Sequence, residues 1–298
     1  MCSSDLASNE NPHGPSPKAV EAVVDAADTV HHYPKSAHTD LTAAIAETWD
    51  LEPAQVWLAA GGDGALDYLA RAMLEPDDGV LVPSPGFAYY GMSARFHHGR
   101  VETYEIPSAN GFAMRAETVL DDYDGHRIVY LTSPHNPTGG RFTLEAIEAI
   151  GEGTGENTLV VVDEAYGEFS DTPSARALLG ERDDIAVLRT FSKAYGLAGL
   201  RLGYALVPGA WADTYAKVNT PFATNLLACK AGLAALEDDD GEAETGETES
   251  GFEFLDPGDE SEDEPDRDDS EEERHESGNA EVESPTRTAG PAAPADGS

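Results

Sequence analysis

Short apolar runs alternate with amphipathic segments along the first 236 residues of the chain. A short apolar run between polar or glycine residues predicts a strand, and apolar residues spaced three or four apart predict a helix. Because strands that alternate with helices are typical of parallel sheets, the pattern predicts a three-layer α/β/α fold with a mostly parallel, seven-stranded sheet. The predicted strands are residues 56–60, 80–83, 101–105, 128–132, 159–162, 185–188 and 202–207.

Helix signals flank and separate these runs. Ser16 offers a capping hydroxyl and Pro17 suits a first helical turn, so a helix is predicted to begin there. Apolar residues also recur at helical spacing in residues 41–45, 66–73, 144–150 and 226–236. These helices are expected to cover both faces of the sheet.

The pattern ends close to Asp238. Residues 237–298 are rich in Glu, Asp, Ser, Gly and Pro and have neither a helical nor a strand period. Such a segment buries too little apolar surface to offset the entropy lost on ordering, so we expect it to be disordered. The predicted organisation is an N-terminal arm and first helix at 1–34, a large domain at 35–236 and an acidic tail at 237–298.

The chain is strongly acidic, with a formal net charge of -39 over 298 residues. Residues 237–298 carry 25 acids and 3 arginines, which leaves a net charge of -17 on the first 236 residues. This balance argues against nucleic acid or an anionic membrane as a partner. An acidic, lysine-poor composition resembles that of proteins from salt-loving (halophilic) organisms, although an ordinary acidic cytoplasmic protein is the alternative.

The cysteine and histidine residues point to no disulfide framework and no metal. Cys2 and Cys229 form no Cys-x-x-Cys motif, and a reducing compartment is expected. The N-terminus lacks a basic start followed by an apolar run, and no stretch is long enough to cross a membrane, so we expect a cytoplasmic protein. The adjacent histidines at 31–32 and 97–98 lack the spacing of helical metal ligands.

Candidate functional residues lie where the predicted strands end, because functional groups of doubly wound sheets collect at the carboxyl ends of strands. Gly62 and Asp63 follow the first strand in a glycine turn that opens a helix, and a helix N-terminus attracts phosphate. A purely structural tight turn is an equal alternative. Phe87 follows the second strand, where its ring would either cover a flat cofactor or pack in the core.

The later strand ends carry polar side chains. Asn136 lies between two prolines, and its amide can both donate and accept hydrogen bonds. Asp163 follows four apolar residues, so its charge needs a partner, which an ion pair or a helix cap would also supply. Ser192 and Lys193 follow the sixth strand, with Arg201 eight residues later. Taken singly, Lys193 is more typical of a surface loop, and Arg201 could equally form a surface salt bridge.

One cofactor uses these groups together. Pyridoxal phosphate requires a lysine amine, a carboxylate beside its pyridine nitrogen, donors for its phenolate oxygen and an anion site for its phosphate. Lys193, Asp163 and Arg201 match the first, second and last of these needs. The combination predicts a pyridoxal-phosphate site more specifically than any one member does.

Five motifs carry a resemblance to a known family: Asn9–Pro12, Tyr33–Pro34, Ser133–Gly139, Asp163–Tyr166 and Ser192–Arg201. They resemble, in order and spacing, the motifs of fold-type I aminotransferases, and among these the histidinol-phosphate aminotransferase family. The similarity extends from about Leu6 to Leu236. It implies the fold of the pyridoxal-phosphate-dependent transferases.

The resemblance implies a role for each matching residue of the cofactor site. Lys193 would bind the cofactor covalently and move a proton between substrate and cofactor, while Asp163 would pair with the pyridine nitrogen. Asn136 and Tyr166 would hold the phenolate oxygen. The residues implied to bind the phosphate are Gly62, Asp63, Ser192 and Arg201, and the residue implied to stack on the ring is Phe87.

The resemblance also implies a homodimer whose two sites are shared. Tyr33 matches a tyrosine that reaches the phosphate of the neighbouring subunit's cofactor. Asn9 and Asn11 lie in a segment that matches an arm over the substrate. Asn136 is implied to contact the substrate as well.

The implied reaction is amino transfer between histidinol phosphate and 2-oxoglutarate, which yields imidazole acetol phosphate and glutamate in histidine biosynthesis. Proteins with the same motifs include aromatic-amino-acid aminotransferases and threonine-phosphate decarboxylases, so these reactions stay open. A protein that binds the cofactor without turnover, or an acidic interaction protein, is the alternative from another class.

The chain departs from the family after residue 236. The family continues into a small α/β domain that supplies an arginine for the substrate carboxylate. The arginines of the acidic tail, Arg267, Arg274 and Arg287, lie in unpatterned sequence. The abrupt change predicts a shifted reading frame or a truncated gene, with a genuine acidic tail as the alternative, and loss of that arginine would weaken substrate positioning.

Overall fold

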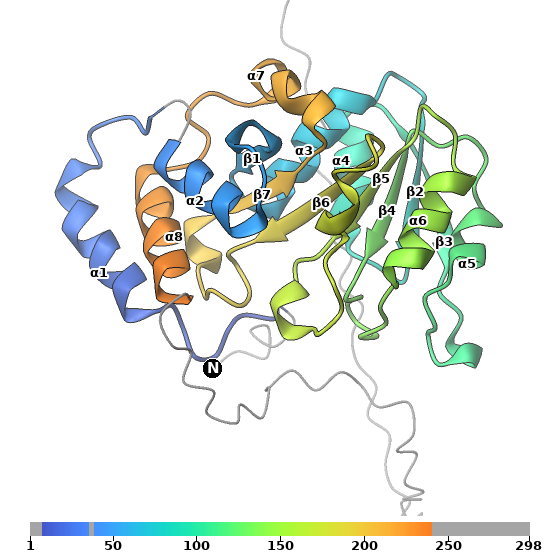
Figure 1. The fold of residues 1–298 in the computed structure, drawn as a ribbon, viewed down its shortest axis with the longest axis horizontal. Coiled ribbons are helices and arrows are strands. Elements are labelled where there is room, and N and C mark those ends of the chain that lie inside the picture. The colour runs from blue at the N-terminus through green and yellow to red at the C-terminus, as the bar shows by residue number, and fades with distance from the viewer. Residues whose placement is uncertain (1–7, 36–38, 240–298) are drawn as a thin grey trace, which may run out of the picture. The chain divides into compact units, whose positions relative to one another are not determined.

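The computed structural model describes residues 8–35 and 39–239, which contain one seven-stranded sheet (Figure 1). The strand order is β1-β7-β6-β5-β4-β2-β3, and only β7 runs antiparallel to its neighbours. The predicted α/β fold and all seven strands are therefore confirmed, with end points shifted by one or two residues. The strands are β1 Val56–Ala59, β2 Gly79–Ser84, β3 Arg100–Glu105, β4 Ile128–Thr132, β5 Leu159–Asp163, β6 Ile185–Thr190 and β7 Gly203–Leu206.

Helices connect and cover these strands. The first begins where the sequence predicts, because the Ser16 hydroxyl accepts a hydrogen bond from the Ala19 amide at 3.2 Å and Pro17 occupies the first turn. The helices are α1 Pro17–Ala26, α2 Thr39–Trp49, α3 Gly61–Met73, α4 Ala88–Phe96, α5 Ala116–Leu120, α6 Leu144–Gly153, α7 Tyr215–Val218 and α8 Leu226–Asp239. Helix α8 extends three residues beyond the predicted domain boundary at 236. The rest of the predicted acidic tail, residues 240–298, lies outside the described residues.

Two apolar cores lie on the two faces of the sheet, because successive strand residues point to opposite sides. On what we call the α3 face, Trp57 of β1 packs with residues of α3, α4 and α7, among them Leu66 of α3 and Tyr90 of α4. On the α6 face, the core includes residues of α1, α2, α5, α6 and α8, with α1 lying against α8 (Figure 1). The central strands β4, β5 and β6 are buried throughout, as expected for parallel strands covered on both faces.

The topology gathers the predicted motifs at one edge of the sheet. Strands β2 to β6 are parallel, and β1 has the same direction because both it and β6 pair antiparallel with β7. The carboxyl ends of six strands therefore meet at one edge, together with the start of β7. No helix within the described residues is long and apolar enough to span a membrane.

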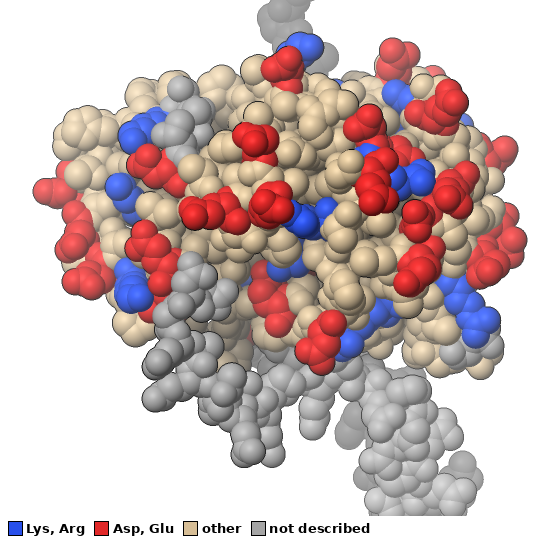
Figure 2. Space-filling view, viewed as in Figure 1, with Lys and Arg blue, Asp and Glu red and all other residues tan. Residues whose placement is uncertain are grey.

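Acidic side chains are distributed over the visible surface. Figure 2 shows Asp and Glu scattered across this face, with Lys and Arg between them and no continuous basic patch. This distribution agrees with the negative net charge of the sequence.

Candidate active site

A cavity of about 390 Å³ lies at the sheet edge where the strand ends meet. The residues at its wall come from β4, β5, β6, α3 and α4, from the loops that follow the strands, and from residues 8–9 of the N-terminal segment. Ten of the residues that the sequence singles out line it: Asn9, Gly62, Asp63, Phe87, Asn136, Asp163, Tyr166, Ser192, Lys193 and Arg201. Residues more than 180 positions apart in the chain thus share one site.

Lys193 is half-buried at this cavity rather than free in solvent. Its ammonium group donates hydrogen bonds to the backbone oxygens of Ser8, at 2.8 Å, and Asn9, at 3.1 Å. It also lies 5.6 Å from the centre of the Tyr166 ring. Burial lowers the pKa of Lys193 below its usual range, with a further lowering from the positive charge of Arg201. A lysine in this state has an increased share of the neutral, nucleophilic amine.

Asp163 ends β5 and is almost fully buried, with 4% of its surface exposed. Its two oxygens accept hydrogen bonds from the Tyr90 hydroxyl at 2.6 Å and from the Ala165 amide at 2.9 Å. Burial is the main cause that raises the pKa of Asp163 to about 6, and the two hydrogen bonds oppose it. No ion pair joins Asp163 to a cation within residues 8–35 and 39–239, so a cationic ligand group in the cavity would relieve an unpaired buried charge.

Tyr166 collects hydrogen bonds from two of the predicted residues. Its hydroxyl accepts from the side-chain amide of Asn9 at 2.9 Å and from that of Asn136 at 3.3 Å. Burial raises the pKa of Tyr166, and the two amide donors oppose this rise. The structure therefore brings together the two residues implied to hold a phenolate oxygen, with Asn9 of the N-terminal segment beside them.

The first turn of α3 and Arg201 form the end of the cavity suited to an anion. Helix α3 begins at Gly61, and the backbone N–H groups of its first turn have no partner within the helix. Arg201 forms an ion pair with Asp63 at 3.0 Å, with both side chains partly exposed. A Cβ atom on Gly61 would come within 2.6 Å of the Arg201 guanidinium, which would then have to move. Gly61 also has a φ of +80°, which favours glycine.

Ser192 and Phe87 complete the cavity wall. Ser192 is 9% exposed and follows β6, directly before Lys193. Phe87 is 47% exposed, so it is not a core residue, and its ring meets the Tyr90 ring edge-on with the centres 5.5 Å apart. Phe87 is thus accessible to a ligand in the cavity that it lines.

Two of the predicted residues do not line the cavity. Tyr33 is 81% exposed and stacks obliquely on Phe222, with ring centres 4.9 Å apart. The Asn11 amide donates to the backbone oxygens of Lys193, at 3.2 Å, and Ala194, at 2.8 Å. Asn11 therefore holds the N-terminal segment against the loop that contains Lys193 and Ala194.

Other lining residues were not anticipated from the sequence: Ser8, Leu66, Tyr90, Thr132, Ala165, Leu188 and Thr190. Thr132 and Thr190 are the last residues of buried strands, so their position at the functional edge was a usable signal. Tyr90 gives no such signal, because it lies within α4 and reaches Asp163 only through the packing of that helix on the sheet.

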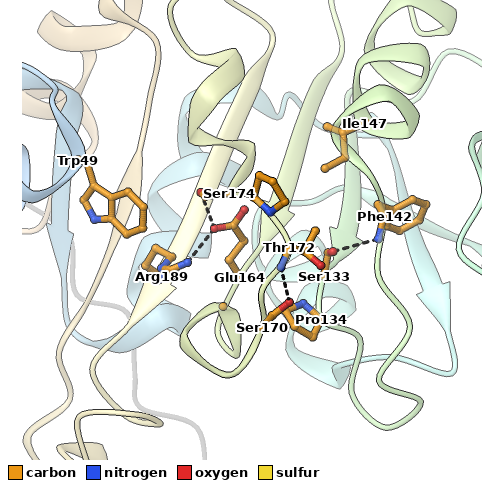
Figure 3. Close-up of a pocket in the computed structure, with 12 residues that line it drawn as sticks. Trp49, Ser133, Pro134, Phe142, Ile147, Glu164, Ser170, Thr172, Ser174 and Arg189 are labelled. Carbon is orange, nitrogen blue, oxygen red and sulfur yellow. Dashed lines mark hydrogen bonds and ion pairs between the residues drawn. The ribbon is translucent and has the colours of Figure 1, made fainter. Parts of the chain in front are cut away.

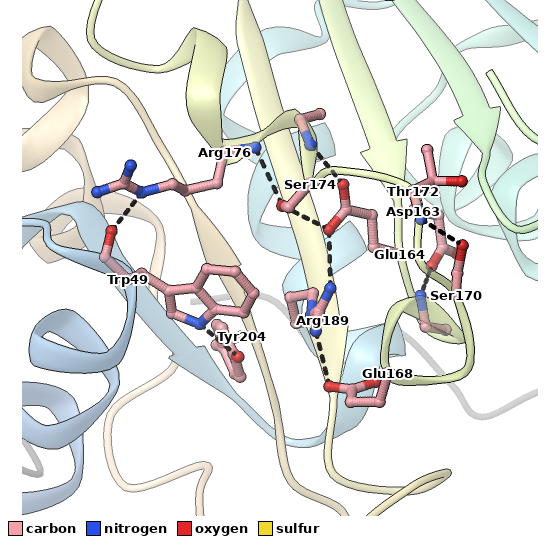
Figure 4. Close-up of polar contacts among 12 residues, drawn as sticks. Trp49, Asp163, Glu164, Glu168, Ser170, Thr172, Ser174, Arg176, Arg189 and Tyr204 are labelled. Carbon is pink, nitrogen blue, oxygen red and sulfur yellow. Dashed lines mark hydrogen bonds and ion pairs between the residues drawn. The ribbon is translucent and has the colours of Figure 1, made fainter. Parts of the chain in front are cut away.

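A separate buried cluster of charges lies on the α6 face (Figures 3 and 4). Glu164, the residue after Asp163, accepts hydrogen bonds from Ala175 N and Ser174 Oγ, each at 2.7 Å, and from Arg189 at 2.8 Å. Arg189 also binds Glu168 at 2.8 Å. We call Glu164, Glu168 and Arg189 the Arg189 cluster. The two terminal nitrogens of the Arg189 guanidinium each pair with one carboxylate, while its buried Nε has no hydrogen-bond partner among the described residues.

Trp49 covers the Arg189 cluster. The Arg189 guanidinium carbon lies 4.6 Å from the centre of the Trp49 ring, and the Trp49 indole N–H donates to the Tyr204 hydroxyl at 2.9 Å. A second, smaller cavity of about 190 Å³ adjoins the cluster, lined also by Ser133, Phe142 and other residues visible in Figure 3. It contains none of the residues that the sequence assigns to the site.

The large cavity thus offers three chemical functions in one space. Lys193 supplies an amine of lowered pKa, Asp163 supplies a buried carboxylate, and the α3 N-terminus with Arg201 supplies an anion site. A ligand that carries a carbonyl group, a cationic centre and an anionic group would find a partner for each. The cavity volume lies in the range of small-molecule sites.

Comparison with known proteins identifies the family. The family model described as aminotransferase class I and II matches residues 4–252. Histidinol-phosphate aminotransferase of Natronomonas pharaonis is 68% identical over 234 residues, which cover 78% of this chain and 66% of the relative. That of Halobacterium salinarum is 65% identical over 244 residues, covering 79% and 67%. These relatives come from halophilic archaea, in agreement with the acidic composition.

Solved structures give the same result. The crystal structure of histidinol-phosphate aminotransferase from Sinorhizobium meliloti in complex with pyridoxal-5'-phosphate superposes with a TM-score of 0.72 at 31% identity, covering 78% of this chain and 63% of that one. Aspartate aminotransferase from Thermus thermophilus with maleate has a TM-score of 0.69 at 27% identity, covering 78% and 64%. The chain spans about two thirds of the length of the relatives it matches. By the extent of the family match and the identity of these relatives, the chain belongs to the class I and II aminotransferases.

Proposed function

We propose that this chain binds pyridoxal phosphate in the large cavity and transfers an amino group between histidinol phosphate and 2-oxoglutarate. The observation that carries the proposal is the convergence of Lys193 and the buried Asp163 on one cavity. The names and identities of the relatives support the choice of reaction within the family.

Lys193 is the catalytic residue of the proposal. When bound, pyridoxal phosphate supplies an aldehyde that reacts with amines and a ring that withdraws electrons from the substrate's α-carbon. The lowered pKa of Lys193 favours the neutral amine that attacks a carbonyl, and the same amine can take a proton from the α-carbon and return it. The amine lies 5.6 Å from the centre of the Tyr166 ring, and both residues line the same cavity.

Asp163 holds the cationic end of the ligand. Its buried, ionised carboxylate would face a protonated ring nitrogen, and the opposite charges would keep each other ionised. Tyr166, with the amide of Asn136, would donate to the phenolate oxygen. Phe87, which lines the cavity and is 47% exposed, would cover the ring.

The phosphate would bind at the opposite end. The N–H groups around Gly62 and Asp63, the Ser192 hydroxyl and the Arg201 guanidinium all line the same cavity. The ion pair with Asp63 restrains Arg201 before any ligand arrives. These residues fit a phosphate because the site combines fixed donors with a cation.

The substrate and the second subunit complete the proposal. Asn9 and Asn136, which meet at the Tyr166 hydroxyl, are placed to contact a substrate, and Asn11 fixes the segment that carries Asn9. The exposed Tyr33 and its neighbour Phe222 support a dimer in which Tyr33 serves the partner's site. Sedimentation of the wild type and of Y33A tests this part, with a monomeric wild type as the contrary outcome. A cytoplasmic location stays a prediction from the sequence.

Absorbance spectroscopy with chemical trapping tests the cofactor assignment. Purified protein with excess pyridoxal phosphate should gain an absorbance band, and borohydride should then fix the cofactor on the peptide that contains Lys193. K193A should lose both signals, while K217A should keep them because Lys217 is exposed on α7. A band that persists in K193A would refute the assignment.

Amino-transfer assays test the choice of substrate. Histidinol phosphate with 2-oxoglutarate should give glutamate faster than an aromatic amino acid does, and threonine phosphate should not be decarboxylated. Bound cofactor with no turnover of any of these would identify the chain as a cofactor-binding protein without this activity.

A further inference from the structure

Tyr90 is the side chain that contacts the Asp163 carboxylate most closely. It lies in the first turn of α4, is fully buried, and donates its hydroxyl proton to Asp163 Oδ2 at 2.6 Å. A hydrogen bond of this length to a carboxylate is a charge-assisted one. The strand-end motifs do not point to this residue, because it lies within α4 and reaches Asp163 only through the packing of that helix.

The direction of this hydrogen bond is fixed by chemistry. Burial and the neighbouring Asp163 charge raise the pKa of the Tyr90 hydroxyl well above its usual range, so it stays protonated. Because its single proton goes to Asp163, the Thr132 hydroxyl, 2.8 Å away, donates to the Tyr90 oxygen. A chain of donation therefore runs from Thr132 through Tyr90 to the carboxylate.

The other groups that face Asp163 set the balance against its charge. The negative charges of Glu164 and Asp63 raise its pKa further, while the Ala165 amide lowers it. Lys193 feels the Asp163 charge across the cavity, without an ion pair between them. Tyr90 is the largest single influence that favours the ionised form.

We propose that Tyr90 is a positioning residue that keeps the Asp163 carboxylate ionised and turned toward the cavity, ready to pair with a protonated ring nitrogen. This role rests on the proposed pyridoxal-phosphate function. Tyr90 occupies one oxygen of Asp163 and the Ala165 amide occupies the other, so the carboxylate cannot rotate without losing both bonds. The remaining lone pairs are left for the ligand.

Tyr130 provides a matched control for the experiment. Its ring stacks on that of Tyr90 with the centres 4.7 Å apart and the planes 8° apart, and it is also fully buried. The Tyr130 hydroxyl has no hydrogen-bond partner among the described residues. Y130F therefore removes a hydroxyl from the same aromatic pair without breaking a bond to Asp163, whereas Y90F removes the bond itself.

The first measurement uses the cofactor-free protein. Aspartate labelled with ¹³C at the carboxyl carbon is titrated by NMR, with D163N identifying the Asp163 signal. Loss of a hydrogen bond to a charged group should raise the Asp163 pKa by about one unit in Y90F and leave it unchanged in Y130F. T132V, which removes the donor behind Tyr90, should give a smaller rise in the same direction. An unchanged pKa in Y90F, or an equal rise in Y130F, would overturn the proposal.

The second measurement adds pyridoxal phosphate over a range of pH. Affinity should fall as the pH drops through the Asp163 pKa, and the midpoint should move upward by about one unit in Y90F but not in Y130F. A matching midpoint in Y90F and wild type would count against the positioning role. If the NMR shift appears but the wild type binds no pyridoxal phosphate, the link between Tyr90 and Asp163 stands and the proposed cofactor function fails.

Discussion

Asp163 and Glu164 are neighbours in the sequence, yet they lie in opposite electrostatic environments on the two faces of the sheet. Both are almost completely buried, at 4% and 5% exposure. Glu164 is paired with Arg189 at 2.8 Å and accepts two further hydrogen bonds (Figure 4). Asp163 has two neutral donors and no ion pair to a cation in the described part of the chain.

The difference separates a structural charge from a functional one. A buried charge whose partners are all supplied by the protein contributes a fixed local geometry and has no need of a ligand. A buried charge without a counter-ion carries a desolvation penalty that a cationic ligand can relieve. The larger cavity adjoins the unpaired carboxylate, and the smaller one adjoins the paired one.

Breaking the ion pairs of the Arg189 cluster should have the largest effect on stability. R189M leaves Glu164 buried without a cation and removes the partner of the partly exposed Glu168, and we expect the free energy of unfolding to fall by about 3–5 kcal/mol. Denaturant titration of the cofactor-free protein measures this. K35M, which removes the exposed pair with Asp40, should cost less than about 0.5 kcal/mol and serves as the control. A loss from R189M no larger than that from K35M would contradict the assignment of the cluster as structural.

The contribution of the unpaired Asp163 to the free energy of unfolding should depend on pH and fall as the pH rises. The folded pKa of Asp163, about 6, lies above the reference value of 3.8, so the folded state binds the proton more tightly. Stability relative to D163N should be highest below pH 4 and fall as the pH rises toward 6, by roughly 3 kcal/mol for a two-unit difference. Denaturant titrations of both proteins between pH 4 and 7 test this. A difference that is constant with pH would show that Asp163 titrates normally.

Of the carboxylates on the two faces, Asp163 should influence ligand binding and those of the Arg189 cluster should not. D163N should lower the affinity for pyridoxal phosphate at least about tenfold, about 1.4 kcal/mol, because the amide cannot neutralise a ring cation. E168Q, a matched change of carboxylate to amide in the Arg189 cluster, should leave that affinity within about twofold. Fluorescence titration at pH 7 distinguishes them. Equal losses of affinity in D163N and E168Q would contradict the distinction between the carboxylates on the two faces of the sheet.

Loss of the Ser174 hydroxyl, which bonds to Glu164 of the Arg189 cluster, should lower stability less than loss of Arg189 does. S174A removes the 2.7 Å donor to Glu164 and the acceptor for the Arg176 amide, and should cost about 1–2 kcal/mol of unfolding free energy. Thermal and denaturant unfolding measure this loss, and pyridoxal phosphate affinity should not change. A weaker affinity in S174A would mean that the two faces are coupled.

The sequence was sufficient for the sheet and for most of the cavity wall. Central parallel strands are buried on both faces, so they appear as continuous apolar runs such as 159–162, and the polar residue at the end of each run marks the functional edge. This is why Asp163, Asn136 and Lys193, which lie far apart in the chain, could be grouped before the structure was known.

Residues that reach the site from within helices could not be found in this way. Tyr90 contacts Asp163 because α4 packs across the end of β2, and Arg189 closes its cluster only when Trp49 of α2 lies over it. Both contacts depend on the packing of elements distant in sequence. The roles of Tyr33 and Asn11 have a different limit, because a contact with a second subunit or a substrate cannot be seen in one chain by itself.

The bonds between Lys193 and the carbonyl oxygens of Ser8 and Asn9 make the N-terminal segment an internal competitor for the amine. An amine that donates to these oxygens as a cation is not the neutral group that bonds to an aldehyde. Release of the segment and loss of a proton must therefore accompany the covalent binding of a carbonyl compound. The observed affinity for such a compound is the intrinsic affinity reduced by the free energy of these intramolecular hydrogen bonds. A ligand that reacts with Lys193 must therefore bind strongly enough to replace the contacts between the lysine and the N-terminal segment.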